Sequence, residues 1–338
     1  MTSRRDWLRD LPKAELHVHL EGTINPSAYA RIARRNGVRH SEDVGSIFSF
    51  TDFQSFLVAF TSVVRGLREP EDLAEIATEY LRSVSSHGVL HVEFLFSPAT
   101  IRHFTPKADL PGMVQAIHAA ARAEEKRTGI SSFVIFDLVR NLGEDAALED
   151  IDLAQRCAQW GVVGVGLGGD ERNFPARDFY KAFDRAKRLG LRRTVHAGEA
   201  AGPESVRDAI EILDAERIGH GVAAIHDNAL MDTIVARGIA IDSCPTSNRL
   251  TGAVAPEAAH PIGEFLKRGV KVTLGSDDPS YFGAGLLDEY DRAMDLGLSH
   301  EHVATVARNS FTTAFADEER KKVWLERLDA YLKEERRG

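Results

Sequence analysis

Polar and hydrophobic residues alternate in residues 14–22, the first segment of the chain with the pattern of a β-strand. The apolar positions are Leu16, Val18 and Leu20, and the polar positions are His17, His19 and Glu21. Successive strand residues face opposite ways, so the apolar side chains are expected in the core and the polar ones together on the other face. Two imidazoles on one face suit a metal ion, because histidine is the commonest metal ligand; two partly buried polar histidines are the alternative.

Seven further short segments, several of them apolar runs, predict strands, and segments with the apolar spacing of helices separate them. The runs are residues 89–96, 133–139, 162–167, 193–199, 217–221, 239–245 and 270–277. Helices are predicted at about residues 25–80, 111–128, 148–160 and 179–189, and another begins at Pro203. Eight strands that alternate with helices predict a parallel sheet closed into a (β/α)8 barrel, with an open doubly wound sheet as the alternative.

The series of strands and helices runs through the whole chain without a linker or a low-complexity tract. Residues 1–338 are therefore expected to form one domain, with extra helices after the first strand and at the C-terminus. The helical segment at about residues 26–80 is rich in phenylalanine, at positions 48, 50, 53, 56 and 60. Ordinary helix packing explains these rings, and so does an apolar lid beside the end of the first strand.

Polar residues gather where the predicted strands end, which is where a (β/α)8 barrel carries its chemistry. They are His17 and His19 on the first strand, His196 and Glu199 on the fifth, His220 on the sixth, and Asp277 and Asp278 on the eighth. Because the ends of parallel barrel strands converge on one rim, residues more than 250 positions apart can surround one ion. The sequence thus predicts one shared site.

Composition narrows the classes of partner. The net charge is −9, with 28% charged and 43% hydrophobic residues, and the basic residues are scattered, which disfavours nucleic acid and anionic membrane. A small-molecule partner is expected. Cys157 and Cys244 form no paired framework and are expected to be free thiols. No apolar signal segment or membrane-spanning run is present, so a cytoplasmic location is expected.

Five motifs, in order and spread over the chain, resemble those of the adenosine and adenine deaminase family of the amidohydrolase superfamily, which includes aminodeoxyfutalosine deaminases. They are PKAELHVHLEG at residues 12–22, HAGE at 196–199, RIGHG at 217–221, SCPTSN at 243–248 and SDDP at 276–279. The resemblance implies a (β/α)8 barrel, one catalytic zinc ion and hydrolytic loss of ammonia from a 6-aminopurine.

The resemblance also implies a metal-ligand set, residue by residue. The implied zinc ligands are His17, His19, His196 and Asp277, and a donor set of three imidazoles and one carboxylate suits zinc. His220 matches the family residue that orients the attacking water. The fourth strand has no lysine at its end, so the two-metal arrangement of other amidohydrolases is not supported and one zinc ion per chain is expected.

Three further residues acquire roles from the resemblance. Glu199 matches the proton shuttle, which the chemistry needs because attack on the ring carbon places negative charge on the adjacent nitrogen. Asp278 matches the residue that accepts a hydrogen bond from the purine beside the attacking water. Gly169 matches a backbone contact to the far side of the ring, where the lack of a Cβ permits close approach.

The motifs give conflicting indications of the substrate. Glu21 stands where typical adenosine deaminases have the aspartate that holds the ribose 5′-hydroxyl, as in the adenine and aminodeoxyfutalosine deaminase branches. Residues 167–171 and 196–205 instead resemble nucleoside deaminases. The expected activity is deamination of an adenosine-type or 2′-deoxyadenosine-type nucleoside to the inosine type; the alternatives are aminodeoxyfutalosine deaminase of menaquinone biosynthesis and adenine deaminase acting on the free base. A 5′-phosphate is expected to be disfavoured.

Two other classes of function agree less well with the sequence, and the remaining histidines are expected to have structural roles or to be solvated. An ester or amide hydrolase has no need of Glu199 beside a ring nitrogen, and a binding protein on an inactive deaminase fold has no need of a complete set of catalytic residues. His103 lies outside the matched motifs and is expected to be solvated, while His260 is expected to make a structural contact. His91 and Glu93 are expected to form an interior polar pair.

Overall fold

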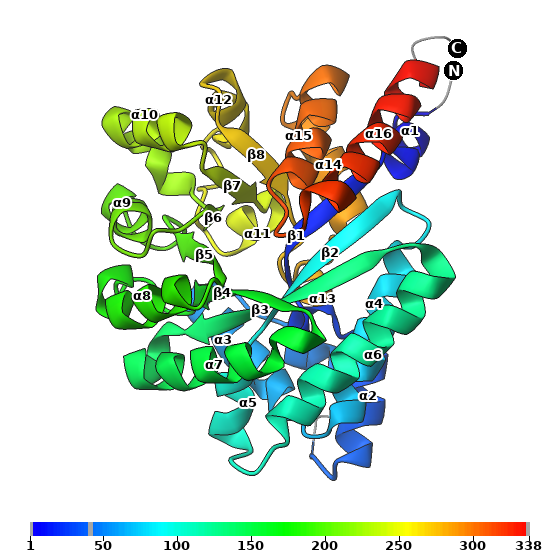
Figure 1. Cartoon of the computed structure of the whole chain (residues 1–338), viewed down its shortest axis with the longest axis vertical. Coiled ribbons are helices and arrows are strands. Elements are labelled where there is room, and N and C mark those ends of the chain that lie inside the picture. Colours follow the sequence, from blue (N-terminus) through cyan, green and yellow to red (C-terminus); the bar gives the residue numbers. More distant parts are fainter. Residues whose placement is uncertain (1–2, 40–42, 336–338) are drawn as a thin grey trace.

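Eight parallel strands, in the order of the sequence, form the centre of the molecule (Figure 1). The computed structural model describes residues 3–39 and 43–335. The strands are β1 (Lys13–His19), β2 (Val89–Phe96), β3 (Ser131–Val139), β4 (Val162–Gly168), β5 (Arg192–Ala197), β6 (Arg217–His220), β7 (Ala240–Ser243) and β8 (Lys271–Leu274). Each strand from β1 to β7 pairs with the next, with at least two residue pairs in register.

The sheet closes between its first and last strands, just beyond the end of β8. Val18 forms a parallel bridge with Asp277. The His19 N–H donates to the Asp277 carbonyl at 2.8 Å, and the Asp277 N–H donates to the His17 carbonyl at 3.1 Å. Closure confirms the predicted (β/α)8 barrel and excludes the open sheet.

Helices surround the strands in Figure 1. They are α1 (Arg4–Asp10), α2 (Pro26–Arg35), α3 (Phe53–Val64), α4 (Pro70–Val84), α5 (Pro98–Phe104), α6 (Leu110–Thr128), α7 (Gly143–Cys157), α8 (Tyr180–Arg188), α9 (Pro203–Glu211), α10 (Asn228–Arg237), α11 (Pro245–Leu250), α12 (Ile262–Lys267), α13 (Pro279–Phe282), α14 (Leu286–Asp295), α15 (His300–Thr312) and α16 (Glu318–Glu335). Short 3₁₀ turns are η1 (Glu21–Thr23), η2 (Val44–Phe48), η3 (Arg140–Leu142), η4 (Ala158–Trp160), η5 (Ala176–Phe179) and η6 (Val222–His226). The extra helices predicted after the first strand and at the C-terminus are present.

The segment predicted as one helical stretch near residues 25–80 is divided into η1, α2, η2, α3 and α4. Local capping explains two of the new starts. Asp52 accepts from the Ser55 N–H at the beginning of α3, and Pro70 occupies the first turn of α4, where a missing N–H costs nothing. The insertion is therefore a set of short helices.

The first strand ends at His19, three residues before its predicted end. Leu20 has helical dihedral angles, and Glu21 begins η1. The next residue must be glycine, because a Cβ on Gly22 would lie 2.0 Å from the Asp278 carboxylate. The strand alternation that put Glu21 on the face of the histidines therefore stops one residue before it.

Buried charged residues fill part of the barrel interior. Arg217 is 1% exposed and pairs with Glu93 at 2.6 Å and Asp242 at 3.1 Å. His91 Nε2 lies 3.5 Å from Glu93 Oε1, and both residues are fully buried, which confirms the predicted interior pair. Each carboxylate in this group has a cationic or hydroxyl partner, since Thr273 donates to Asp242 at 2.6 Å.

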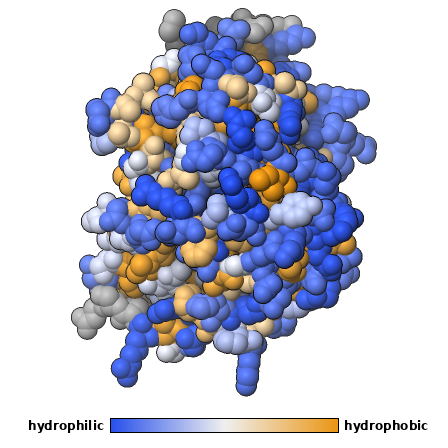
Figure 2. Space-filling view, turned by 90° about the vertical axis from the view of Figure 1, so that its left-hand side faces the viewer, coloured by the Kyte–Doolittle hydropathy of each residue, from blue (hydrophilic) through white to orange (hydrophobic). Residues whose placement is uncertain are grey.

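The surface in Figure 2 is largely hydrophilic, with hydrophobic residues scattered over it. In the described part of the chain, no helix combines the length and the apolar character needed to cross a membrane. Cys157 and Cys244 are both buried and free, as predicted.

Candidate active site

Three imidazoles and one carboxylate converge at the carboxyl ends of the strands. His17 and His19 come from β1, His196 comes from β5, and Asp277 follows β8. One Asp277 oxygen lies 3.4 Å from His17 Nε2 and 3.3 Å from His19 Nε2. A potential ligand atom from each residue lies within 4.8 Å of all the others, and all four residues are buried. The structure thus brings together the four predicted metal ligands.

The unpaired atoms of this cluster fit a bound cation. His19 Nε2 and His196 Nε2 face each other at 3.2 Å, which requires a proton or a cation between two lone pairs. His17 Nε2 is buried and has no hydrogen-bond partner among the described residues. Three nitrogen donors and one oxygen donor that converge in this way match the ligand preference of zinc.

The backbone around Asp277 is held in an unusual conformation. Its φ is +61°, in the left-handed region that non-glycine residues rarely adopt outside constrained sites. Glu15 anchors the preceding residue, because its carboxylate accepts from Ser276 N–H at 3.1 Å and from Ser276 Oγ at 2.6 Å. Tyr80 donates to the other oxygen of Glu15. These bonds anchor the segment that connects the end of β8 to Asp277.

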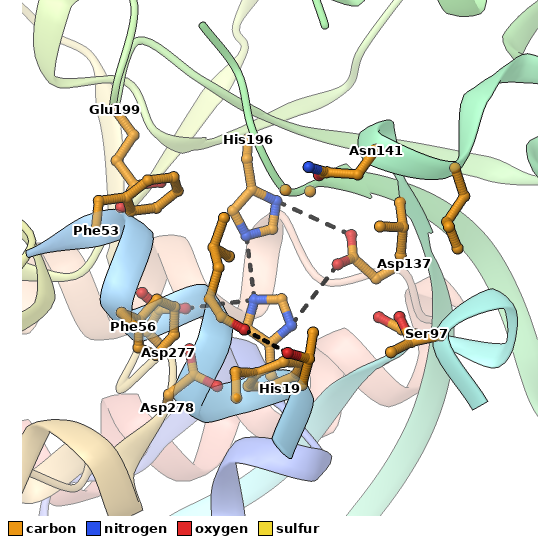
Figure 3. A pocket seen from close by; sticks show the side chains of 18 of the residues that line it. His19, Phe53, Phe56, Ser97, Asp137, Asn141, His196, Glu199, Asp277 and Asp278 are labelled. Atoms are coloured by element: carbon orange, nitrogen blue, oxygen red, sulfur yellow. Dashed lines mark hydrogen bonds and ion pairs between the residues drawn. The ribbon is translucent and has the colours of Figure 1, made fainter. Parts of the chain in front are cut away.

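Asp137, near the end of β3, lies behind two imidazoles of this cluster, and the sequence alone indicated no role for it. Its two oxygens lie 3.8 Å from His19 Nδ1 and 4.0 Å from His196 Nδ1 (Figure 3). Both distances exceed that of a hydrogen bond, and His19 Nδ1, His196 Nδ1 and Asp137 Oδ1 have no hydrogen-bond partner among the described residues. A carboxylate that approaches the far nitrogen of a metal-bound histidine to hydrogen-bond distance orients the ring and raises its basicity. The signal in the sequence was one aspartate near the end of an otherwise apolar strand, FVIFDLV.

His220 and Glu199 lie beside the ligand cluster. His220 Nε2 is 3.5 Å from Glu199 Oε2 and 3.9 Å from Asp277 Oδ2. His220 also has a positive φ, of 62°. Burial raises the pKa of Glu199 to about 8, and the negative charges of Asp277 and Glu171 act in the same direction. Glu199 is therefore suited to carry a proton at neutral pH.

The loop that carries Glu199 is fixed by one carboxylate. Glu171 accepts from the backbone N–H groups of Gly198, Glu199, Ala200 and Ala201, at 2.5 to 3.1 Å. Four donors around one carboxylate leave the loop few alternative conformations. Glu171 stood in a matched motif, but its role depends on contacts across the fold.

A cavity of about 270 Å³ opens beside these groups (Figure 3). Its polar lining includes His19, Asp137, Asn141, His196, Glu199, His220, Asp277 and Asp278, and its apolar lining includes Phe53, Phe56, Leu57, Phe60, Phe104, Val139 and Leu142. Phe53 to Phe60 belong to α3, so part of the phenylalanine-rich insertion faces the cavity. His103 also lines it and is exposed, as predicted.

Gly169 and Asp278 line the cavity, whereas Glu21 lies outside the lining. Gly169 has φ +96°, and a Cβ there would approach the Asn141 side-chain oxygen to 2.6 Å, so glycine is required. Asp278 Oδ1 is buried and has no partner among the described residues. Glu21 is fully buried and accepts from the Ser97 N–H at 2.9 Å; burial raises its pKa to about 7.

Comparison with known proteins places this geometry in a family. The model of the adenosine deaminase family matches residues 12–331. An adenine deaminase of Hahella chejuensis is 37% identical over 97% of this chain and 99% of its own length. The crystal structure of an adenine deaminase from Arthrobacter aurescens superposes with a TM-score of 0.90, at 33% identity, over 96% of this chain and 99% of that one.

A third comparison adds a metal-bound neighbour. A Burkholderia ambifaria amidohydrolase with bound zinc superposes with a TM-score of 0.91, covering 98% of this chain and 94% of that one, at 24% identity, which shows the shared fold. The family match and the 37% identical relative go further than the fold, because each extends over nearly the whole chain. The chain therefore belongs to the adenosine deaminase family of the amidohydrolase superfamily and is a hydrolytic aminohydrolase.

Proposed function

We propose that this protein is an adenine deaminase, which hydrolyses the free base adenine to hypoxanthine and ammonia. The observation that carries the proposal is the name shared by the relatives at 37% and 33% identity, since both are adenine deaminases and both match over nearly their full length. This reverses the order of the alternatives in the sequence analysis, where the nucleoside was favoured over the free base.

The cavity supports a small and uncharged substrate. Its volume of about 270 Å³ is just below the usual range of small-molecule sites, about 300–1,000 Å³. Its lining contains four carboxylates and no lysine or arginine. A 5′-phosphate would therefore meet like charge without a cationic partner, so AMP is expected to be a poor substrate.

The residues proposed to hold one zinc ion are His17, His19, His196 and Asp277. When bound, zinc lowers the pKa of a coordinated water and so supplies hydroxide near neutral pH. Asp137 would keep the rings of His19 and His196 turned toward the ion. His220, whose Nε2 lies 3.9 Å from Asp277 Oδ2, would hold and orient the reacting water.

Glu199 is proposed to transfer protons, and Asp278 to hold the purine ring. The C6–O bond forms and the C6–N bond breaks. Of the two protons that the reacting water loses, one would pass to the leaving amine, which departs as ammonia, and the other would restore the proton of Glu199. Glu199 would give its proton to the ring nitrogen next to C6, where negative charge develops. The free Oδ1 of Asp278 would accept a hydrogen bond from a ring N–H beside the reacting water. Gly169 would contact the far side of the purine through its backbone.

A substrate panel tests the proposal. The purified, zinc-loaded enzyme is assayed for ammonia release with adenine, adenosine, 2′-deoxyadenosine, aminodeoxyfutalosine and AMP. The expected result is a kcat/KM for adenine at least about tenfold above the others, because a site closed around the base discriminates against a bulky N9 group. A preference for adenosine or for aminodeoxyfutalosine would overturn the free-base proposal and restore one of the alternatives.

The same five substrates test the predicted contact between Glu21 and the substrate. One of its oxygens is committed to the Ser97 N–H, while Oε2 is buried and has no partner among the described residues. Glu21→Asp shortens the side chain by one methylene and withdraws that free oxygen. A change in the ranking of the five substrates in Glu21→Asp supports contact with the N9 side of the substrate, and an unchanged ranking argues against it.

A further inference from the structure

A row of hydrogen bonds links the backbone of α12 to the side of the His220 ring that faces away from Glu199. The Ile262 N–H donates to His260 Nδ1 at 3.2 Å. His260 Nε2 lies 3.2 Å from Asn248 Oδ1, and Asn248 Nδ2 lies 3.0 Å from His220 Nδ1. Asn248 and His220 are buried, and His260 is 9% exposed. The sequence alone indicated no catalytic function for Asn248 or His260.

The direction of every bond in this row follows from its first donor. A backbone N–H can only donate, so His260 Nδ1 must accept and its proton must sit on Nε2. His260 therefore donates to the amide oxygen of Asn248. With its oxygen engaged, Asn248 presents its NH₂ group to His220, and His220 Nδ1 must accept. A neutral His220 then carries its proton on Nε2.

The row keeps this direction at neutral pH because His260 stays uncharged. Burial, reinforced by the positive charge of Arg249, lowers the pKa of His260 to about 4. Asn248 is also fixed at its backbone, since its N–H donates to the Cys244 carbonyl at 2.9 Å and its carbonyl accepts from the Val254 N–H at 2.8 Å. The amide is thus a fixed connection between two rings.

We propose that Asn248 and His260 are positioning residues that hold His220 in the tautomer with its proton on Nε2, so that His220 meets the reacting water as a hydrogen-bond donor. The groups that face this nitrogen agree with a donor there. Asp277 offers a carboxylate oxygen at 3.9 Å, and Glu199, with Oε2 at 3.5 Å, keeps an acceptor oxygen even when it is protonated. In this tautomer Nε2 has no free lone pair, so His220 does not remove a proton from the water. The tautomer itself follows from the hydrogen bonds, whereas its role in catalysis rests on the proposed deaminase function.

Asn248→Asp is the sharpest variant, because it changes one NH₂ group to an oxygen at nearly constant shape. The aspartate still accepts from His260, but it can bond to His220 only if Nδ1 carries a proton. His220 is then driven to the opposite tautomer or to the charged form. Loss of one correctly placed donor to the reacting oxygen is expected to lower kcat by about 10²–10³-fold, with KM and zinc content retained.

His260→Leu removes a residue one hydrogen bond further from His220, and it leaves the Asn248 side-chain amide free to flip. A smaller fall in kcat is expected in this variant. If both residues act through His220, the effects are not additive, and adding His260→Leu to Asn248→Asp changes kcat little further. Ser247→Ala is the matched control: Ser247 lies on the same helix, and its buried hydroxyl has no partner among the described residues, so kcat should not change.

Nitrogen NMR of the zinc-loaded protein, labelled with ¹⁵N-histidine, reads the tautomer directly, and His220→Asn identifies the signals of His220. The expected result is a protonated Nε2 in the wild type and a protonated Nδ1 in Asn248→Asp. A protonated Nδ1 in the wild type overturns the proposal, as does Asn248→Asp with kcat within about twofold of the wild type. The wild-type spectrum decides even if the variant fails to fold or if adenine proves not to be the substrate.

Discussion

The carboxylate of Glu171 accepts a hydrogen bond from the backbone N–H of Glu199 at 3.1 Å, and it binds the neighbouring N–H groups of the same loop. Glu171 follows β4 and Glu199 follows β5, so the contact joins two adjacent strand ends. The proposed proton donor is therefore positioned by a second carboxylate whose own charge also raises the pKa of Glu199.

Glu171→Gln tests this arrangement. Glutamine keeps the shape but turns an NH₂ group toward backbone donors, so at least one bond to the loop is lost and Glu199 shifts. A fall in kcat of about 10- to 100-fold is expected, with zinc content unchanged. Glu204→Gln, at an exposed position in the first turn of α9, makes the same chemical change and should leave kcat unaltered. Wild-type kcat in Glu171→Gln would contradict the positioning role.

The proposed metal ligands make a second prediction. His17→Ala or Asp277→Ala should abolish both bound zinc and activity, because each removes one of the four converging donors. His226→Ala, at an exposed position, should retain both. Metal analysis of the three purified variants decides, and full zinc occupancy in the two ligand variants would refute the assignment.

Zinc should also stabilise the folded chain. An ion that binds only the native state adds about 2.7 kcal/mol at 100 times its dissociation constant. The chelated wild type is therefore expected to unfold at a lower temperature than the zinc-loaded wild type. His17→Ala should unfold at one temperature whether or not zinc is added, and a zinc-dependent shift in that variant would place the ion elsewhere.

Glu199→Gln separates proton donation from binding. The amide keeps the size of the side chain but has no acidic proton, so kcat should fall by about 10²–10⁴-fold while zinc remains bound. KM for adenine should change much less, because the cavity lining is otherwise intact. Turnover close to the wild type would move the acid role to another residue, and Asp278 is the next candidate.

Much of the fold was accessible from the sequence because its signals are local. The strands are short segments that are either apolar runs or alternate polar and apolar residues, with β6 (RIGH) as an exception, and capping residues or prolines mark several helix starts, so the order of the eight strands could be predicted without knowledge of contacts. His17, His19, His196 and Asp277 were found because matched motifs stand at strand ends, which converge in a barrel. The strand ends themselves were misplaced, since the turn at Leu20 and the left-handed residue Asp277 depend on contacts between β1 and β8.

The residues that escaped prediction act through distant partners. Asp137 is one charged residue in an apolar strand, and only the barrel brings it within 4.0 Å of the rings of His19 and His196. Asn248 and His260 are twelve positions apart, and their hydrogen-bond direction depends on the backbone of Ile262. Neither spacing nor hydropathy encodes such relations, because both describe a residue and its neighbours in sequence.

Glu289 gives a prediction for the pH dependence of stability. It lies on α14, is 1% exposed and accepts from the Thr246 N–H at 3.1 Å, at the start of the helix that carries Asn248. Burial raises the pKa of Glu289 from 4.5 to about 7, so between these values the folded chain holds a proton that the unfolded chain has released. The contribution of Glu289 to stability is therefore fully present below about pH 4.5 and is lost as the pH rises through 7.

Glu289→Gln fixes the neutral form and keeps an oxygen for Thr246. The free energy of unfolding of the variant, minus that of the wild type, should rise between pH 4.5 and 7 and then level off. The full rise has an upper limit of roughly 3.5 kcal/mol, since the pKa moves from 4.5 to about 7 and each pKa unit corresponds to about 1.4 kcal/mol. Urea denaturation at pH 4.5, 6 and 8 measures this difference, in which the titration of every other carboxylate cancels.

Glu257→Gln is the control, because it makes the same chemical change at an exposed position. A difference for Glu289→Gln that does not vary with pH would mean that Glu289 is already ionised in the folded protein at pH 4.5, stabilised by Thr246 and the first turn of α11 despite its burial.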